Sequence, residues 1–401
     1  MVKFMHTADW HLGIKFSQLG SKADAVREMR IKTAEKLLEA AKESNVDFVL
    51  ISGDLFDSNN IERRTLNRVI QLMLKASPLD VYILPGNHDP LTLDSPYLYS
   101  AWDSLSNVHI LKDPEPLNEV NSGVVLYPCP ITQKQSSKDL TEWINANNSE
   151  ISIGIAHGNI EIEGFIDASN FPIDPERADK SGLNYLALGE WHSFYEHTSK
   201  DGQIKTVYPG TPETTKFGEK NSGNAVIVEI NDSNDPPVIN EINTGSLNWV
   251  KNTETIYSEE DLLRVHSTLQ EISNPENTIL KLSINGITDQ EIRNEIESLA
   301  ANYESNFMFL DIDMHELYLQ PNSLEFKAMI PEGTILSHTF DALLALMKYH
   351  PRLQEYSNLS PEKVDEIFQE IKDHESIKQV SPEILQRAIL ILYRITMEVS
   401  K

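Results

Sequence analysis

The sequence predicts an α/β protein that continues into a small α+β module and a helical segment. Short apolar runs rich in β-branched residues, such as 46–52 and 151–156, are typical of buried parallel strands. Amphipathic patterns over 23–41 and 63–75 alternate with these runs and predict connecting helices. Five of the predicted strands end in residues that can bind metal ions. Open α/β folds bind ligands at the carboxyl ends of their strands, so we expect the functional site at this edge.

Composition limits the classes of function that fit this chain. Its 401 residues are enough for two or three domains. The net charge of −27 argues against holding nucleic acid on a broad basic surface, but it leaves open an enzyme whose metal ions and partner supply positive charge. The single cysteine, Cys129, excludes an internal disulfide framework and favours a cytoplasmic location. There is no run of 18 apolar residues, and residues 1–6 lead into a strand, so we expect neither a membrane span nor a signal peptide.

The stretch around which the chain is organised is the turn after strand 46–52. Gly53 allows the chain to turn sharply, and Asp54 and Asp57 follow with a spacing of three residues. One of these carboxylates could bridge two cations while the other orients a neighbouring group. An aspartate-rich turn without function is the alternative for this stretch on its own, so the other strand ends must decide.

Two neighbouring strands end in similar groups. Asp9 and His11 follow the first strand, and a carboxylate and an imidazole on one loop can hold a single cation. The strand 81–84 leads into a tight glycine turn that carries Asn87 and His88. This second pattern is the more specific one, because the turn must place two different functional side chains.

Two later strands complete the set. The run 151–156 ends in His157, and the run 184–188 is followed by Glu190 and His192. Residues two apart on an extended loop point to the same side, as two ligands of one site should. A single histidine after a strand is more often structural, but its place in a series of five such strand ends favours a ligand role.

The predicted secondary structure divides the chain into three segments. The three predicted segments are 1–246 with the strand ends, 247–331 as an α+β module, and 332–401 as a helical region. A short helix is predicted over 140–147. In the last segment, helices are predicted to begin near Ser360 and Ser381, and apolar residues from 384 to 395 cover more than one helix face. That segment either packs on its own protein as a helical hairpin or docks onto helices of a partner.

Taken together, these motifs resemble those of the calcineurin-like metallophosphoesterase superfamily. The residues that carry the resemblance are Asp9-x-His11, Gly53-Asp54-x-x-Asp57, Gly86-Asn87-His88-Asp89, His157 and Gly189-Glu190-x-His192. Within the superfamily, residues 9–13 and 53–57 and the overall layout are similar to the SbcD-type DNA nucleases. The resemblance covers the whole chain. It implies a four-layer αββα sandwich, a capping domain that recognises DNA, and helices that bind an SbcC-type coiled-coil ATPase.

The resemblance also implies a dinuclear metal site with two ligand sets that share Asp54. The first set is Asp9, His11, Asp54 and His192, and the second is Asp54, Asn87, His157 and Glu190. His88 would stabilise the transition state or protonate the leaving oxygen, and Asp57 would fix the orientation of His88. Two cations roughly 3.5–4 Å apart lower the pKa of a bridging water and clamp a phosphate, which suits phosphodiester hydrolysis.

One position departs from this pattern, because the family usually has histidine where Glu190 stands. A carboxylate can still bind a metal ion, and it makes the second site harder and more negative. We therefore expect Mn²⁺ as the cofactor, with Mg²⁺ as the alternative. The added charge would also weaken the Lewis acidity of the bound cation.

Three functions remain in competition. The first is a metal-dependent DNA exonuclease, also endonucleolytic, that works with an SbcC-type ATPase bound to the C-terminal helices. The second is a phosphoesterase acting on a nucleotide or phosphoprotein, which the acidic surface favours. The third is a non-catalytic scaffold, with Glu190 marking decay of the site; it ranks last because every ligand position keeps a metal-capable side chain and His88 is intact. The sequence leaves a homodimer open.

Overall fold

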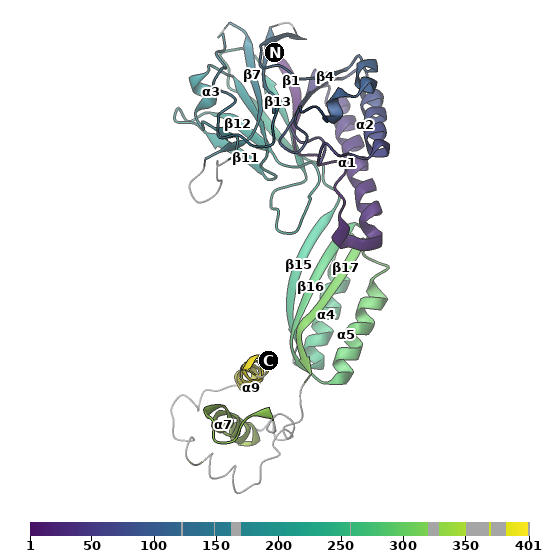
Figure 1. Ribbon diagram of the computed structural model, residues 1–401, viewed down its shortest axis with the longest axis vertical. Coiled ribbons are helices and arrows are strands. Elements are labelled where there is room, and N and C mark those ends of the chain that lie inside the picture. The colour runs from purple at the N-terminus through teal and green to yellow at the C-terminus, as the bar shows by residue number, and fades with distance from the viewer. Residues whose placement is uncertain are drawn as a thin grey trace. The chain divides into compact units, whose positions relative to one another are not determined.

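The computed structural model in Figure 1 divides into two units. The described residues are 1–121, 123–147, 149–161, 170–256, 258–319, 329–349, 369 and 382–399. The first unit comprises Met1–Lys251, Asn274–Leu280 and Asn306–Phe309, and the second takes in the described residues of 252–273, 281–305 and 310–401. The division into three segments at residues 246 and 331 stays a prediction.

The first unit contains two six-stranded sheets, of which the first has the strand order β14-β13-β1-β2-β3-β4. Its strands are β1 (Val2–Thr7), β2 (Phe48–Ser52), β3 (Asp80–Leu84), β4 (Val108–Ile110), β13 (Asn224–Ile230) and β14 (Val238–Asn243). Strands β1 to β4 run parallel, and β13 pairs antiparallel with β1 and β14. Helices α1 (Ala23–Glu43) and α2 (Arg63–Ala76) cover one face, with Leu37, Val49 and Val69 in the shared core. The helices predicted over 23–41 and 63–75 are confirmed.

The second sheet has the order β11-β12-β10-β7-β6-β5. Its strands are β5 (Leu117–Asn121), β6 (Val124–Cys129), β7 (Ile151–His157), β10 (Tyr185–Gly189), β11 (Phe194–Thr198) and β12 (Ile204–Pro209). The four central strands run parallel, and the two edge strands pair antiparallel with their neighbours. The outer face of this sheet packs against α3 (Arg177–Lys180) and the segment 140–146.

The helix predicted over 140–147 is wrong, because this segment consists of turns and irregular backbone. Ala146 donates its backbone N–H to Ser181 O at 2.9 Å instead of to the carbonyl four residues earlier. The carboxylate of Asp139 accepts the backbone N–H of Thr141 at 2.8 Å. Such competing hydrogen bonds disfavour a helix. The outer layer on the second sheet is therefore thinner than the helical layer on the first.

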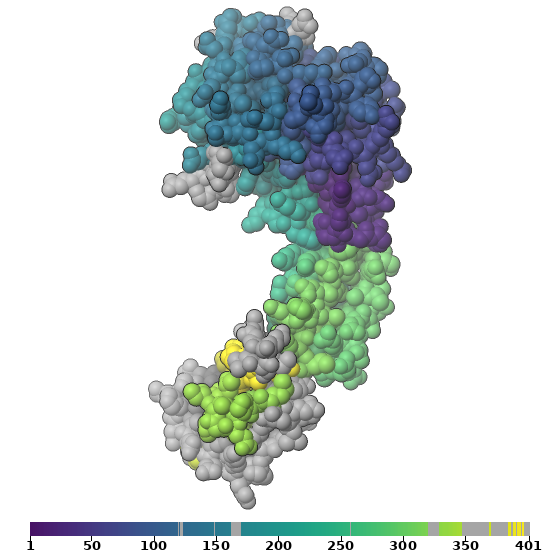
Figure 2. All heavy atoms as spheres, in the orientation of Figure 1, coloured from purple at the N-terminus to yellow at the C-terminus, as the bar shows by residue number. Residues whose placement is uncertain are grey.

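The two sheets pack face to face. Phe4 stacks on Phe48 with ring centroids 5.2 Å apart, and its ring edge meets Tyr185 across the interface at 5.5 Å. Other side chains of this buried core include Leu50 and Ile153. Figure 2 shows one outer face of the sandwich, in purple to teal. Helices, two sheets and a thin outer layer make four layers, so the predicted αββα sandwich is confirmed.

A three-stranded sheet and two helices form the predicted α+β module. Its elements are β15 (Asn248–Ile256), α4 (Glu259–Glu271), β16 (Thr278–Thr288), α5 (Gln290–Tyr303) and β17 (Phe309–Leu319). Ser258 caps α4 by accepting the Asp261 N–H, and Asp289 caps α5 by accepting the Ile292 N–H at 2.8 Å. These caps explain why both helices begin where a serine or an aspartate stands.

The second unit also holds α7 (Ile335–Tyr349) and α9 (Pro382–Val399). They pack together through Phe340, Leu344 and Leu392. The helix starts predicted at Ser360 and Ser381 lie outside the described residues, although α9 begins directly after the second of them. Within the described part of the chain, no helix combines the length and apolar character needed to cross a membrane.

Shorter elements connect these parts. They are η1 (Ser17–Lys22), η2 (Pro96–Leu98), η3 (Ser100–Ser104), β8 (Asn159–Ile160), β9 (Pro172–Ile173) and η4 (Pro275–Asn277).

Candidate metal centre

The carboxyl ends of β1, β2, β3, β7 and β10 bring all nine predicted site residues into one connected cluster. These residues are Asp9, His11, Asp54, Asp57, Asn87, His88, His157, Glu190 and His192. They come from both sheets. The loops after the parallel strands therefore meet where the sequence places the functional site.

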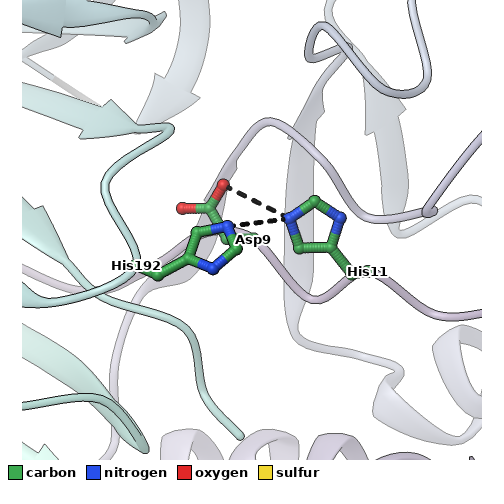
Figure 3. Close-up of side chains that lie close together, drawn as sticks. All are labelled: Asp9, His11 and His192. Carbon is green, nitrogen blue, oxygen red and sulfur yellow. Dashed lines mark hydrogen bonds and ion pairs between the residues drawn. The ribbon is translucent and has the colours of Figure 1, made fainter. Parts of the chain in front are cut away.

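Asp9, His11 and His192 form the first group of the cluster, shown in Figure 3. Nε2 of His11 lies 3.1 Å from Nε2 of His192 and 3.9 Å from Oδ1 of Asp9. Asp9 and His11 are buried, while His192 is half-buried. A carboxylate and two imidazole nitrogens this close together could hold one divalent cation.

Asp54 links this group to a second one. Its Oδ2 lies 3.8 Å from Nε2 of His11 and 3.3 Å from Nε2 of His157. Its Oδ1 accepts the backbone N–H of His88 at 2.9 Å. One buried carboxylate oxygen thus faces histidines from both groups, which is the geometry that a bridging ligand requires.

Glu190 and Asn87 extend the second group. Oε2 of Glu190 lies 3.0 Å from Nε2 of His157 and accepts a hydrogen bond from Nδ2 of Asn87 at 2.6 Å. Oδ1 of Asn87 is buried without a hydrogen-bond partner, whereas Nε2 of His157 faces the carboxylates of Asp54 and Glu190. A buried polar atom without a partner is costly, so Oδ1 of Asn87 fits a role as a metal ligand.

His88 and Asp57 stand at the rim of the cluster. The imidazole of His88 is exposed and packs edge-on against His11, with ring centroids 4.8 Å apart. Its Nδ1 donates to the backbone oxygen of Asp57 at 3.0 Å, while the carboxylate of Asp57 lies 3.7 Å from Nδ1 of His11. The backbone of Asp57, and not its side chain, therefore holds the ring of His88.

Backbone geometry explains why the motifs contain glycine. A Cβ atom at Gly53 would lie 2.1 Å from Nδ1 of His157, and one at Gly86 would lie 2.1 Å from Oδ1 of Asp54. Gly53 also has φ +95°. Several site residues themselves adopt positive φ values: Asp9 at 56°, His11 at 42°, Asp54 at 52° and Glu190 at 104°. Strained backbone of this kind clusters at functional sites.

Burial and the charges of neighbouring groups shift the pKa values of several residues in this cluster. Burial raises the pKa of Asp9 to about 7 and holds the pKa of the His11 imidazole well below its usual range. Burial favours neutral Asp54, but the charge and hydrogen bond of His157 outweigh it and lower the pKa of Asp54. Burial likewise opposes protonation of His157, yet Asp54 and Glu190 raise its pKa well above the usual value. Several carboxyl groups lie close together in this buried cluster, and divalent cations would balance their negative charge.

Three further residues support the site, and the sequence reasoning gave none of them a role. Asp89 accepts the N–H groups of Phe56 and Gly86 at 2.9 and 2.7 Å, which joins two of the loops. Glu219 accepts from Nδ1 of His192 at 2.7 Å. Buried Arg30 on α1 is the third. Only Asp89 stands inside a motif that could have pointed to it.

Arg30 donates to backbone oxygens of two loops that carry site residues. Its Nη2 donates to Trp10 O at 2.6 Å, and its Nη1 donates to Glu213 O at 2.9 Å and to Thr214 O at 3.2 Å. Trp10 lies between Asp9 and His11, and it is buried with its Nε1 donating to Thr7. The indole therefore packs against the loop that carries Asp9 and His11.

Known proteins resemble this chain in sequence. The uncharacterized metallophosphoesterase YhaO of Bacillus subtilis is 25% identical over 246 residues, 57% of each chain. The DNA double-strand break repair protein Mre11 of Aeropyrum pernix is 25% identical over 262 residues, 60% of this chain and 61% of that one. The SbcD component of the nuclease SbcCD of Staphylococcus saprophyticus is 30% identical over 128 residues, 31% of each. This chain thus spans less than two thirds of the length of the first two relatives.

The family model of the calcineurin-like phosphoesterases matches residues 2–228, more than half of the chain. The matched region contains all nine residues of the cluster. It also contains both sheets except for β14 and the last two residues of β13. This chain belongs to the calcineurin-like phosphoesterase family.

Proposed function

We propose that this chain is a metal-dependent DNA nuclease that hydrolyses phosphodiester bonds at DNA ends, as an exonuclease and also an endonuclease. The observation that carries the proposal is the sharing of Asp54 between His11 and His157, which suits a pair of metal ions. Similarity to proteins named Mre11 and to the nuclease SbcCD favours DNA over other phosphate esters.

Two ligand sets would hold the metal ions. Asp9, His11, Asp54 and His192 form the first set, and Asp54, Asn87, His157 and Glu190 form the second. Carboxylate, amide and imidazole donors suit Mn²⁺, with Mg²⁺ as the alternative. Bound divalent cations would supply Lewis acidity toward the phosphodiester and would activate water at neutral pH.

The chain itself would orient the substrate and move a proton. His88 donates from Nδ1 to Asp57 O, which leaves Nε2 available at the exposed rim. As an imidazolium, the ring also carries a proton on Nε2, and we assign to this atom the protonation of the leaving oxygen or the stabilisation of charge on the phosphoryl group. The hydrogen bond from the backbone of His88 to Asp54 fixes its distance from the proposed bridging ligand.

We further propose that the helices α7 and α9 dock onto an SbcC-type coiled-coil ATPase. Helix α9 buries Leu385 and Leu392 toward α7, yet Ile384, Ile391 and Ile395 are 54%, 60% and 40% exposed. Spacings of seven and four residues place these isoleucines on one helix face. An exposed aliphatic stripe suits a helical partner.

A second candidate is a phosphoesterase for a nucleotide or phosphoprotein. The net charge of −27 favours it, because a DNA backbone is repelled by an acidic surface unless metal ions or a partner compensate. The non-catalytic scaffold ranks below both, since Oδ1 of Asn87 is buried without a partner and Nε2 of His157 still converges with the carboxylates.

The deciding experiment is incubation of the purified chain with end-labelled duplex and hairpin DNA and Mn²⁺, beside the His88→Ala variant and a chelator control. Cleavage by the unmodified chain alone supports the nuclease. Hydrolysis of a generic phosphodiester, while the DNA stays uncut, favours the second candidate.

For the partner, replacing Ile384, Ile391 and Ile395 with glutamate should abolish co-purification with the ATPase and leave hydrolysis of small substrates unchanged. Retained co-purification would reject the assignment of α9.

A further inference from the structure

Glu219 forms a buried hydrogen-bonded unit behind His192. Its side chain is 5% exposed, and its Oε1 accepts from Nδ1 of His192 at 2.7 Å. Its two oxygens also accept from Thr215: Oε2 from the backbone N–H at 2.7 Å and Oε1 from the hydroxyl at 2.5 Å. The carboxylate is therefore held by three donors and cannot turn freely.

This arrangement decides where a neutral His192 carries its proton. An ionised carboxylate only accepts hydrogen bonds, so Nδ1 of His192 must be the protonated nitrogen. The lone pair then lies on Nε2, the atom that faces His11 at 3.1 Å in the first group of the cluster. Histidine ligands of metal ions commonly have their tautomer fixed by a carboxylate in this way.

We infer that Glu219 is a positioning residue that fixes His192 as the Nδ1–H tautomer and keeps its Nε2 lone pair on the first metal site. The inference rests on the proposed function, because it deepens the role of His192 there. It concerns a residue outside the metal-binding motifs, 27 positions away from its histidine.

The loop that carries Glu219 is itself anchored. Arg30 on α1 holds the carbonyl oxygens of Glu213 and Thr214, and it also holds Trp10 O beside His11. The carboxylate of Glu213 accepts from Thr33 and from the backbone of Ser246. Glu219 thus projects from a segment that is tied to the same helix as the loop of His11, and this fixes the direction of its hydrogen bond.

The substitution Glu219→Gln tests the inference with almost no change in shape. The backbone N–H of Thr215 needs an acceptor, so the amide oxygen of glutamine takes the place of Oε2. The amide NH₂ group then faces Nδ1 of His192 and donates to it. The neutral imidazole must carry its proton on Nε2, which removes the lone pair from the metal site.

Two measurements separate this effect from a loss of structure. Long-range ¹H–¹⁵N NMR of the histidine-labelled, metal-free chain at about pH 9 reads the tautomer directly, with His192→Gln used to assign the signal. Binding of Mn²⁺ is measured separately by titration. The matched control is Asp80→Asn, which alters another carboxylate–histidine pair, Asp80–His109 at 2.9 Å, away from the cluster.

We expect Nδ1–H in the unmodified chain, Nε2–H in Glu219→Gln, and a loss of Mn²⁺ affinity of about 10–100-fold at one site. Asp80→Asn should change neither measurement. A His192 protonated on Nε2 in the unmodified chain, or an unchanged tautomer and affinity in Glu219→Gln, would overturn the inference alone. An unmodified chain that binds no Mn²⁺ would instead overturn the proposed function and the inference with it.

Discussion

Asn87 donates from Nδ2 to Oε2 of Glu190 at 2.6 Å, so the residue that departs from the family pattern is bonded to another proposed ligand of the same metal ion. The same hydrogen bond orients the Asn87 amide and leaves its Oδ1 without a partner. In the proposed second site, Glu190 would therefore do two things: it would add a negative charge, and it would fix the direction of the neutral ligand Asn87.

The substitution Glu190→His should change the metal preference of the second site. Imidazole is a softer donor without charge, so we expect the ratio of Zn²⁺ to Mg²⁺ affinity to rise about tenfold, or about 1.4 kcal/mol. Competition titrations measure this ratio. Glu196→His on β11 is the control and should leave it unchanged. An unaltered ratio in Glu190→His would show that Glu190 is not a ligand.

His88→Ala should separate catalysis from metal binding. The backbone N–H of His88 bonds to Asp54, and its ring packs against His11. Neither proposed ligand set includes its imidazole. We expect the rate of phosphodiester hydrolysis to fall by about 10²–10⁴-fold, with Mn²⁺ affinity within error of the unmodified chain. His109→Ala on β4 controls for loss of a half-exposed histidine. Equal rates in the two variants would remove His88 from the mechanism.

Gly86→Ala should damage both stability and metal binding. The added Cβ would lie 2.1 Å from Oδ1 and 2.5 Å from the backbone nitrogen of Asp54, and neither atom can move without disturbing the proposed bridge. We expect a loss of about 3 kcal/mol in the free energy of unfolding, measured with urea, and weak Mn²⁺ binding. Gly202→Ala, where nothing lies within 4 Å but φ is +83°, measures backbone strain without a steric clash and should leave Mn²⁺ binding unchanged. Unchanged stability and Mn²⁺ binding in Gly86→Ala would contradict the close packing at Gly86.

The free energy of unfolding of the metal-free chain should depend on pH because the pKa of Asp9 is raised in the folded state. Burial raises the pKa of Asp9 to about 7, from 3.8, so in this range the folded state keeps a proton that the unfolded state releases. Stability is therefore lost as pH rises from 3.8 to about 7, at up to about 1.4 kcal/mol per pH unit. Metal binding needs the ionised carboxylate, so Mn²⁺ affinity should increase over the same range.

The difference between the unmodified chain and Asp9→Asn isolates this contribution, because the other titrating groups are common to both. Thermal unfolding without metal, followed from pH 4 to pH 8, provides the measurement. Parallel stability curves for the two chains would show that Asp9 is ionised throughout.

The sandwich and the clustering of the nine residues follow from the sequence for a local physical reason. Each strand is a short apolar run that ends in polar residues, and parallel strands bring those ends to one edge. The residues that support the site, such as Arg30 and Glu219, follow no local sequence pattern. Arg30 bonds to Glu213 across 183 positions, and Glu219 stands in an ordinary polar stretch. Such pairings depend on how the loops fold back, which periodicity does not encode.

Arg30→Lys should show how far the first site depends on this support. Lysine cannot reach Trp10 O, Glu213 O and Thr214 O together, so buried carbonyl groups would lose donors. We expect a loss of about 1–3 kcal/mol in the free energy of unfolding and weaker Mn²⁺ binding at one site. Arg68→Lys, in a surface pair with Glu28, should cost at most about 1 kcal/mol and leave binding unchanged. If both variants bind Mn²⁺ as the unmodified chain does, the loops of His11 and Glu219 hold their positions without Arg30.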